Sequence, residues 1–326
     1  MQQGLMEKPW VLVSKLGPGG ICLRFAHLVE QHFTVVTEEH FHRDRCGQKI
    51  RAVFVWATKP TVNRALLEAL PTLAVVVSGG VGVDHLDVET INKFGVKVCN
   101  TPYVVDGATA DLGMALMLAS ARNLLYGHNF CLSREMEWMP EDSMGTDVTG
   151  ATLGIIGMGR IGYQVAKRAK GFDMKILYHN RNRRKEEEEA AVGARYCKTL
   201  DELLCESDFV MVVVNLSPQT HKLIGARELA MMKPTATLIN ISRGLVVDQD
   251  ALVDVLQRGA IRAAALDVTY PEPLPRDHPL LALPNAIVVP HIGTYTLETM
   301  QMMVERMVIN ALAVLRGDEP PNEVKM

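Results

Sequence analysis

Long hydrophobic runs are missing from this sequence. The longest, LGMALMLAS at residues 112–120, is about half of the ~20 apolar residues that span a membrane, and it ends in charged sequence. The N-terminal segment MQQGLMEKPW contains no apolar core of the kind that a secretion signal needs. We therefore expect no membrane segment, a buried helix at residues 112–120, and a cytoplasmic protein.

The sequence also has no large excess of positive or negative charge, and its cysteines do not form paired motifs. The 34 Lys and Arg residues nearly balance 37 Asp and Glu residues, so we expect no general attraction to nucleic acid or to a membrane surface. The six cysteines form neither a CxxC pair nor a His/Cys spacing typical of metal sites, which predicts reduced thiols and no bound metal. They are Cys22, Cys46, Cys99, Cys131, Cys197 and Cys205.

Short apolar runs alternate with longer helical patterns along the whole chain. The runs before residue 103 include VLV, AVFVWA, LAVVVSGG and VKVCNT, and those after residue 150 include ATLGIIG, MKILYHN, DFVMVVVN, ATLINIS, AAALDV and AIVVPH. Strands that are apolar on both faces and joined by helices predict parallel sheets covered on both sides. The predicted fold class is α/β, with two doubly wound parallel-sheet domains joined by a hinge.

The C-terminal segment indicates how the chain divides. Its apolar residues recur at the spacing of one buried helix face, at Met300, Met303, Val304, Met307, Val308 and Ala311. The first domain lacks a closing helix, and 326 residues exceed the usual size of a single core. We therefore expect one domain from residues 1–102 with 298–326, and a second from residues 103–297.

The segment LGIIGMGRIG predicts a dinucleotide site. Gly157, Gly159 and Gly162 have GxGxxG spacing between an apolar strand and a helical pattern. The first glycine permits a tight turn, the second lets the backbone approach a pyrophosphate, and the third lets helix and strand pack closely. The helix start, at Arg160 and Ile161, would supply amide groups and positive potential to the phosphates.

The next strand ends at Tyr178–Asn180, where such a fold usually carries the Asp or Glu that binds the ribose hydroxyls. Here Asn180 and Arg181 take that place, and an Arg can bind a 2′-phosphate. The alternative is that Arg181, Arg183 and Arg184 pair with the glutamates at 186–189. We predict NADPH as the preferred cofactor, with NADH possible, and a solvated helix start at RRKEEEE.

Three later strand ends carry charged side chains, namely Arg243, Glu272 and His291. Taken singly, such an Arg is often part of a surface ion pair, such a Glu is often simply exposed, and a lone His is usually structural. Together, at the carboxyl ends of strands in a dinucleotide fold, they suit the reduction of a 2-keto acid. Arg243 would bind the carboxylate and carbonyl, His291 would protonate the new alkoxide, and Glu272 would keep His291 charged.

The motifs LGIIGMGRIG, NLSPQTHKLIG, LINISRGLVVD, ALDVTYPEPLP and VVPHIG resemble the D-isomer-specific 2-hydroxyacid dehydrogenase family, above all its glyoxylate/hydroxypyruvate reductases, including forms labelled 2-ketogluconate reductase. This resemblance implies a Rossmann-type cofactor domain and a flavodoxin-like substrate domain. It assigns substrate binding to Arg243 and proton transfer to Glu272 and His291. The implied cofactor contacts further include Thr109, Leu216, Ser217, Ile241, Asp267 and Gly293, and the implied substrate loop is Gly80, Val81 and Gly82.

The resemblance also implies a homodimer in which the long helix and the connector after the hinge reach the partner. Trp138 in that connector is then expected at the interface rather than in the partner's cleft. Gly79 and Gly80, with Trp56 and Ala57 at the end of a facing strand, suggest a roomy pocket that would admit a sugar-derived keto acid. We expect no regulatory domain after residue 326. The alternative function is that of a transcriptional corepressor-like protein that senses the nicotinamide pool through the same fold.

Overall fold

A computed structural model describes residues 7–133 and 138–325. The chain divides into two compact units, unit 1 with Met1–Val105 and Tyr295–Met326, and unit 2 with Asp106–Thr294. Each unit contains its own parallel β-sheet, of five and seven strands respectively, so the predicted α/β class with two parallel-sheet domains is confirmed. No helix within the described residues is both long enough and apolar enough to cross a membrane.

The sheet of unit 1 is built from the apolar runs of the first hundred residues. Its strands are β1 (Trp10–Val13), β2 (Thr34–Thr37), β3 (Ile50–Val55), β4 (Val75–Ser78) and β5 (Lys97–Cys99). They pair in the order β2-β1-β3-β4-β5, and every pairing is parallel. This is the order of flavodoxin-like sheets, in which loops at the carboxyl ends of the strands form the binding edge.

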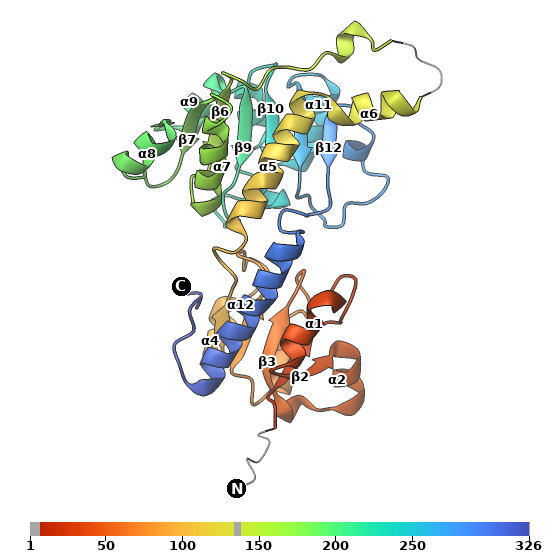
Figure 1. Cartoon of the computed structure of the whole chain (residues 1–326), viewed down its shortest axis with the longest axis vertical. Helices are drawn as coiled ribbons and strands as arrows, with labels where there is room; N and C mark the ends of the chain where they lie inside the picture. Colours follow the sequence, from red (N-terminus) through yellow and green to blue (C-terminus); the bar gives the residue numbers. More distant parts are fainter. Residues whose placement is uncertain (1–6, 134–137, 326) are drawn as a thin grey trace. The chain divides into compact units, whose positions relative to one another are not determined.

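Helices cover both faces of this sheet. The helices α1 (Leu23–Glu30) and α12 (Leu297–Arg316) pack on one face, while α2 (Glu38–Asp44), α3 (Arg64–Ala69) and α4 (Val88–Lys93) pack on the other. Figure 1 shows α12, the blue C-terminal helix, beside the N-terminal strands of the same unit. All six residues predicted for its buried face are buried, which confirms that prediction.

The sheet of unit 2 contains the strands β6 (Thr152–Ile156), β7 (Lys175–His179), β8 (Ala194–Tyr196), β9 (Phe209–Val212), β10 (Thr237–Asn240), β11 (Ala263–Leu266) and β12 (Ala286–Val288). Their order is β12-β11-β10-β9-β6-β7-β8, all parallel. The order reverses between β6 and β9, so the loops after these strands border the crevice in which open α/β sheets bind ligands.

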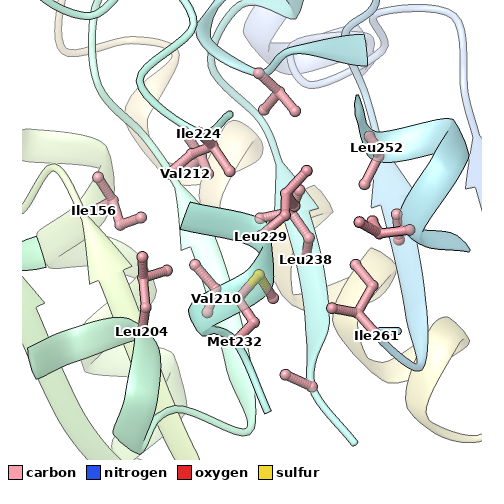
Figure 2. Close-up of a cluster of buried hydrophobic side chains, with 14 of the residues drawn as sticks. Ile156, Leu204, Val210, Val212, Ile224, Leu229, Met232, Leu238, Leu252 and Ile261 are labelled. Carbon is pink, nitrogen blue, oxygen red and sulfur yellow. The ribbon is translucent and has the colours of Figure 1, made fainter. Parts of the chain in front are cut away.

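Unit 2 is also covered on both faces. The helices α5 (Asp106–Ala121), α7 (Arg160–Lys170) and α8 (Glu186–Val192) pack on one side, and α9 (Leu200–Glu206), α10 (Ala226–Met231) and α11 (Gln249–Gln257) pack on the other. Figure 2 shows the second side, where Leu204, Leu229 and Leu252 of these helices meet strand residues such as Val210 and Leu238. The predicted buried helix at residues 112–120 is the C-terminal half of α5.

Helix α6 (Leu124–Leu132) differs from the others because none of its residues is buried. Leu124, Leu125 and Leu132 are exposed, although the helix is mostly apolar. Figure 1 shows α6 extending away from the rest of unit 2. The connector predicted after it lies partly outside the described residues, at 134–137, and resumes at Trp138, whose side chain is exposed.

Four single turns of 3-10 helix complete the described structure, at Gly47–Lys49, Glu141–Ser143, Gly244–Val246 and Pro279–Leu281. The third begins directly after Arg243. It therefore belongs to the same strand-end loop as the residue predicted to bind substrate.

Candidate active site

The glycine loop between β6 and α7 has the geometry that its sequence predicts. Gly157 has φ +102°, and a Cβ there would lie 2.8 Å from the backbone of Val213 and Val214. A Cβ on Gly162 would lie 2.3 Å from the carbonyl oxygen of Gly157. A Cβ on Gly159 would meet nothing within 4 Å, so this side of the loop is open to a ligand. The first and third glycines are thus explained by packing, and the second by access.

The first residues of α7 are Arg160 and Ile161, whose amide groups lie at the helix N-terminus next to the loop. A helix N-terminus favours anions, because its first amide groups lack partners within the helix. Arg160 Nε also donates to Asp106 Oδ2 at 3.1 Å, and Asp106 is the first residue of α5. This pair links the glycine loop to the start of unit 2, and sequence reasoning missed it.

The loop residue Met158 is held by the turn that follows β7. Asn180 accepts from the Met158 amide through Oδ1 at 2.6 Å and donates to the Met158 carbonyl through Nδ2 at 3.3 Å. Arg184 Nη1 donates to the same carbonyl at 2.8 Å. Asn180, which stands where an acidic residue is usual, therefore connects the two loops that border the predicted cofactor site.

The three arginines of the turn have different partners. Arg183 donates to both carboxylate oxygens of Glu189, at 2.8 and 2.7 Å, and Arg184 donates to Glu188 at 2.5 Å. Arg181 is exposed and makes no hydrogen bond or ion pair with any residue that the structure describes. The alternative pairing with the glutamates thus holds for Arg183 and Arg184 but not for Arg181.

The predicted solvated helix start is wrong for Glu189, which is only 7% exposed. Its carboxylate lies between the Arg183 guanidinium and the Tyr178 phenol, and both groups donate to it. A buried carboxylate is tolerated where charge-assisted hydrogen bonds replace its hydration. Glu186 and Glu187, by contrast, are exposed as expected.

A buried asparagine shapes the loop that carries Arg243. Asn240, the last residue of β10, is 1% exposed and accepts from the amide and hydroxyl of Ser242 at 3.0 and 2.7 Å. Its Nδ2 donates to the Arg243 carbonyl at 3.0 Å. Gly244 follows with no side chain because a Cβ would lie 2.1 Å from the backbone of Thr269. The loop of Arg243 therefore packs against the loop after β11, which carries Glu272.

The structure brings His291 and Glu272 together. His291 Nδ1 donates to Glu272 Oε2 at 2.8 Å, and Glu272 Oε1 accepts from the Thr269 amide at 3.1 Å. The hydrogen bond to Glu272 raises the pKa of His291, and partial burial and the charge of Arg243 oppose that rise. With Nδ1 engaged and the side chain 46% exposed, Nε2 is the ring nitrogen that can meet a substrate. This arrangement can hold and deliver a proton.

Asp267 supports the backbone on either side of His291. The aspartate is 2% exposed, and its carboxylate accepts from the amides of Ile292 at 2.6 Å and Gly293 at 3.0 Å. Its carbonyl accepts from the amide of His291, which has φ +53°. Burial raises the pKa of Asp267. A Cβ on Gly293 would lie 2.9 Å from Asp267 and 3.4 Å from Thr109, so these three predicted cofactor residues are neighbours.

Residues 114–293 match the family model for the NAD binding domain of D-isomer specific 2-hydroxyacid dehydrogenases, which is more than half of the chain. The chain belongs to this family. The matched region lies within unit 2 and contains Arg243, Glu272 and His291. Among the residues that the structure describes, no three His, Cys, Asp or Glu side chains gather as a metal site would require.

Relatives of this dehydrogenase extend over nearly its full length. It is 41% identical over 328 residues to the glyoxylate reductase of Thermococcus onnurineus (strain NA1). This alignment covers 97% of this chain and 96% of the relative. It is 43% identical over 296 residues to glyoxylate/hydroxypyruvate reductase B of Pectobacterium atrosepticum, covering 90% and 92%. The predicted family is therefore confirmed.

A solved structure supports the same assignment. The NADPH-dependent glyoxylate/hydroxypyruvate reductase from Sinorhizobium meliloti, in complex with NADP and malonate, superposes with a TM-score of 0.84 at 29% identity, covering 98% of this chain and 97% of that one. This dehydrogenase is thus an oxidoreductase with a NAD(P)-binding domain, as the sequence predicts.

The remaining predicted cofactor residues of the dehydrogenase occupy two environments. Leu216 and Ser217 lie in the loop after β9, where Ser217 bonds to Thr220 at 2.8 Å. This loop begins at Val213 and Val214, the residues that press against Gly157. Ile241 is 5% exposed and packs into the core of unit 2. Leu216 and Ser217 therefore share the crevice edge with the glycine loop, whereas the Ile241 side chain is structural.

The predicted substrate loop lies in unit 1, directly after β4. The carbonyl of Gly80 accepts from the Thr101 amide at 3.0 Å, and the carbonyl of Val81 accepts from Asn100 Nδ2 at 2.8 Å. Gly82 follows them and is partly exposed. These bonds engage carbonyl oxygens and fix the path of the loop.

The expectation of a roomy pocket at Gly79 needs correction. A Cβ on Gly79 would lie 2.5 Å from the ring of Trp56, so this glycine makes room for the indole rather than for a ligand. Gly80, where a Cβ would meet nothing within 4 Å, remains open.

Proposed function

We propose that this dehydrogenase reduces short 2-keto acids, glyoxylate and hydroxypyruvate, to the D-2-hydroxy acids with NADPH. The His291–Glu272 pair carries the proposal, because it places a proton donor at the edge of a NAD(P)-binding sheet. The rise in the pKa of His291 favours its protonated form, which a reduction consumes. The names of the Thermococcus and Pectobacterium relatives support these two substrates.

The proposed reaction divides between cofactor and protein. The bound nicotinamide supplies the hydride that attacks the carbonyl carbon. Arg243 binds the substrate carboxylate and draws electron density toward the carbonyl oxygen, for which a planar guanidinium is suited. His291 gives its Nε2 proton to that oxygen, while Glu272 holds the ring through Nδ1 and stabilises its charge. Asn240 and Asp267 orient the two loops that present Arg243 and His291.

We propose that Arg181 binds the 2′-phosphate of NADPH. It lacks a partner among the described residues, while Arg183 and Arg184 are engaged by Glu189 and Glu188. Asn180 replaces the carboxylate that would repel this phosphate. Arg181→Asp should therefore shift the ratio of kcat/KM values from NADPH toward NADH. An unchanged ratio would contradict the assignment.

We propose that residues 1–102 with 298–326 bind the substrate, and that residues 103–297 bind the cofactor. In the first part, amide groups of Gly80, Val81 and Gly82 would meet the substrate carboxylate, since adjacent backbone N–H groups form anion-binding nests. The carbonyls of Gly80 and Val81 are already engaged by Thr101 and Asn100. The remaining cofactor contacts are those given above for Thr109, Leu216, Ser217 and Gly293.

We also propose a homodimer in which α6 lies at the interface. A helix with Leu124, Leu125 and Leu132 exposed and no residue buried leaves apolar surface that a second copy can cover. Trp138, in the connector that follows α6 in the sequence, is a further large apolar side chain and is 84% exposed. A large exposed aromatic side chain is typical of interface anchors.

The test measures nicotinamide absorbance with glyoxylate, hydroxypyruvate, 2-ketogluconate and pyruvate, each with NADPH and NADH. We expect turnover of the first two, faster with NADPH. His291→Ala should reduce turnover by about two to four orders of magnitude with little change in NADPH binding, because it removes only the acid. NADPH binding without turnover of any keto acid would instead favour the corepressor-like alternative.

A further inference from the structure

We propose that Tyr178 is a positioning residue for cofactor selectivity, because its buried phenol holds the turn that presents Arg181 to the 2′-phosphate. Tyr178 does not touch the cofactor site itself. It acts through Glu189, Arg183 and the backbone of Arg184. The proposal rests on the proposed NADPH preference.

The phenol joins the two ends of the turn. Tyr178, in β7, is 0% exposed. Its hydroxyl donates to Glu189 Oε1 at 2.5 Å and accepts from the amide of Arg184 at 2.9 Å. A single buried oxygen thus bonds to helix α8 and to the turn before it. The bond to Glu189 is buried and the bond from Arg184 is partly buried, so the loss of either partner is costly.

Glu189 completes this network by engaging Arg183. The two side chains form a bidentate pair at 2.8 and 2.7 Å. The hydrogen bond from Arg183 lowers the pKa of Glu189 to about 2, and burial together with the contact to Glu189 raises the pKa of Tyr178 to about 12. At neutral pH the carboxylate is therefore charged and the phenol keeps its proton, so the donors and acceptors of the network do not change.

The turn is also tied to the glycine loop, at Asn180 and at Arg184, through Met158. Arg181 lies between these two anchors and the Tyr178 contact, on a backbone that is already ordered. Binding to a preorganised group costs less conformational entropy than binding to a mobile one. Because Arg183 is paired with Glu189, a phosphate would have to break an ion pair to bind it. Binding of the phosphate to Arg181 breaks no ion pair with a described residue.

This network should affect NADPH more than NADH. The glycine loop would contact the pyrophosphate that both cofactors carry, whereas the turn faces the ribose position at which they differ. Tyr178→Phe removes one oxygen and keeps the ring. It leaves the Met158 contacts of Asn180 and Arg184 in place, so the glycine loop should keep its shape.

The experiment compares binding of 2′,5′-ADP and ADP by titration calorimetry in the full-length protein. Tyr178→Phe removes both hydrogen bonds of the phenol, so it should weaken 2′,5′-ADP binding by about tenfold and ADP binding by less than about twofold. The matched control is Tyr163→Phe, which loses the phenol bond to the Glu188 carbonyl but keeps the ring that lies 4.7 Å from the Arg184 guanidinium. It should bind both nucleotides as the parent protein does.

Arg181→Ala, alone and combined with Tyr178→Phe, separates the two proposals. If Tyr178 acts through Arg181, Tyr178→Phe should have no further effect on 2′,5′-ADP once Arg181 is absent. Unchanged 2′,5′-ADP binding in Arg181→Ala would overturn the proposed cofactor preference. If Arg181→Ala weakens 2′,5′-ADP binding as expected but Tyr178→Phe leaves the ratio of 2′,5′-ADP to ADP affinity unchanged, only the positioning role of Tyr178 is overturned.

If the Tyr178→Phe protein does not fold, Glu189→Asp tests the same network. The shorter carboxylate keeps the charge but does not span both Arg183 and Tyr178, so it should also weaken 2′,5′-ADP selectively. An affinity ratio equal to that of the parent protein would count against the network.

Discussion

Replacing Gly162 by alanine tests why the third glycine of the loop carries no side chain. A Cβ at this position would lie 2.3 Å from the carbonyl oxygen of Gly157 and 3.2 Å from its carbonyl carbon. Both are backbone atoms, so no rotamer change relieves the contact. Gly157 has little room to retreat, because its own missing Cβ would lie 2.8 Å from the backbone of Val213 and Val214. Helix α7 must therefore move away from the loop, by about 1 Å to reach ordinary contact distance.

Two opposing effects decide the stability of Gly162→Ala. Alanine favours the helix over glycine by about 1 kcal/mol. Overpacking against a fixed neighbour costs about 1–3 kcal/mol, and contact with backbone on a rigid loop belongs at the upper end. We therefore expect a net loss of about 1–2 kcal/mol, which lowers the Tm by roughly 2–8 °C for a unit of this size. Displacement by about 1 Å of the amides that are predicted to bind the pyrophosphate should reduce kcat/KM by about a hundredfold.

Gly159→Ala is the matched control, since it adds the same methyl group to the same loop. Nothing lies within 4 Å of a Cβ at Gly159 in the protein alone. The free energy of unfolding should therefore change by no more than about 0.5 kcal/mol, and the Tm should stay close to that of the parent protein. The methyl group would still occupy the approach of the pyrophosphate, and NADPH binding should weaken strongly. Thermal unfolding without cofactor and calorimetric titration with NADPH distinguish the two variants.

The reasoning fails if Gly162→Ala unfolds at the parent temperature and binds NADPH normally. It also fails if Gly159→Ala is destabilised as much as Gly162→Ala, because the distinction between a packing glycine and an access glycine would then be unfounded.

Three further predictions concern the reaction and the assembly. Glu272→Gln removes the carboxylate that raises the pKa of His291. The loss of kcat/KM for keto-acid reduction with rising pH should therefore begin at a lower pH. An unchanged pH profile of kcat/KM contradicts the pairing. Asn240→Ala frees the loop of Arg243 and should reduce kcat/KM for the keto acid at least tenfold, while calorimetry shows unchanged NADPH affinity. Leu125→Asp should convert a dimer to monomers in light scattering, because a charge opposes burial of α6; a dimer that persists would exclude this interface.

Much of the architecture could be predicted because parallel strands and their helices leave local patterns. Strands buried on both faces must be apolar at every position, as AVFVWA and DFVMVVVN are. The face of α12 was predictable from helical spacing alone, although the sheet that it covers is formed by residues about 200 positions earlier. The glycine loop was predictable because neighbouring backbone atoms leave no room for a side chain at Gly157 or Gly162.

Contacts between side chains of different structural elements were not predictable from local patterns. The Glu189 carboxylate belongs to a charged run that predicts a solvated helix, yet it is buried because Tyr178 and Arg183 lie beside it in the fold. The space at Gly79 suggested an open pocket, but the ring of Trp56 fills it. In both cases the local sequence specifies which residue is present and the tertiary packing specifies what lies next to it.

The sequence by itself determined the fold class, the glycine loop, and the strand ends that carry Arg243, Glu272 and His291, since these depend on local periodicity and on the order of residues along the chain. Only the tertiary structure decided which of these groups meet. It joined His291 to Glu272 at 2.8 Å, and it engaged Arg183 and Arg184 while leaving Arg181 without a described partner. Hydrogen bonds require contact within about 3 Å, and only folding brings residues from separate loops that close.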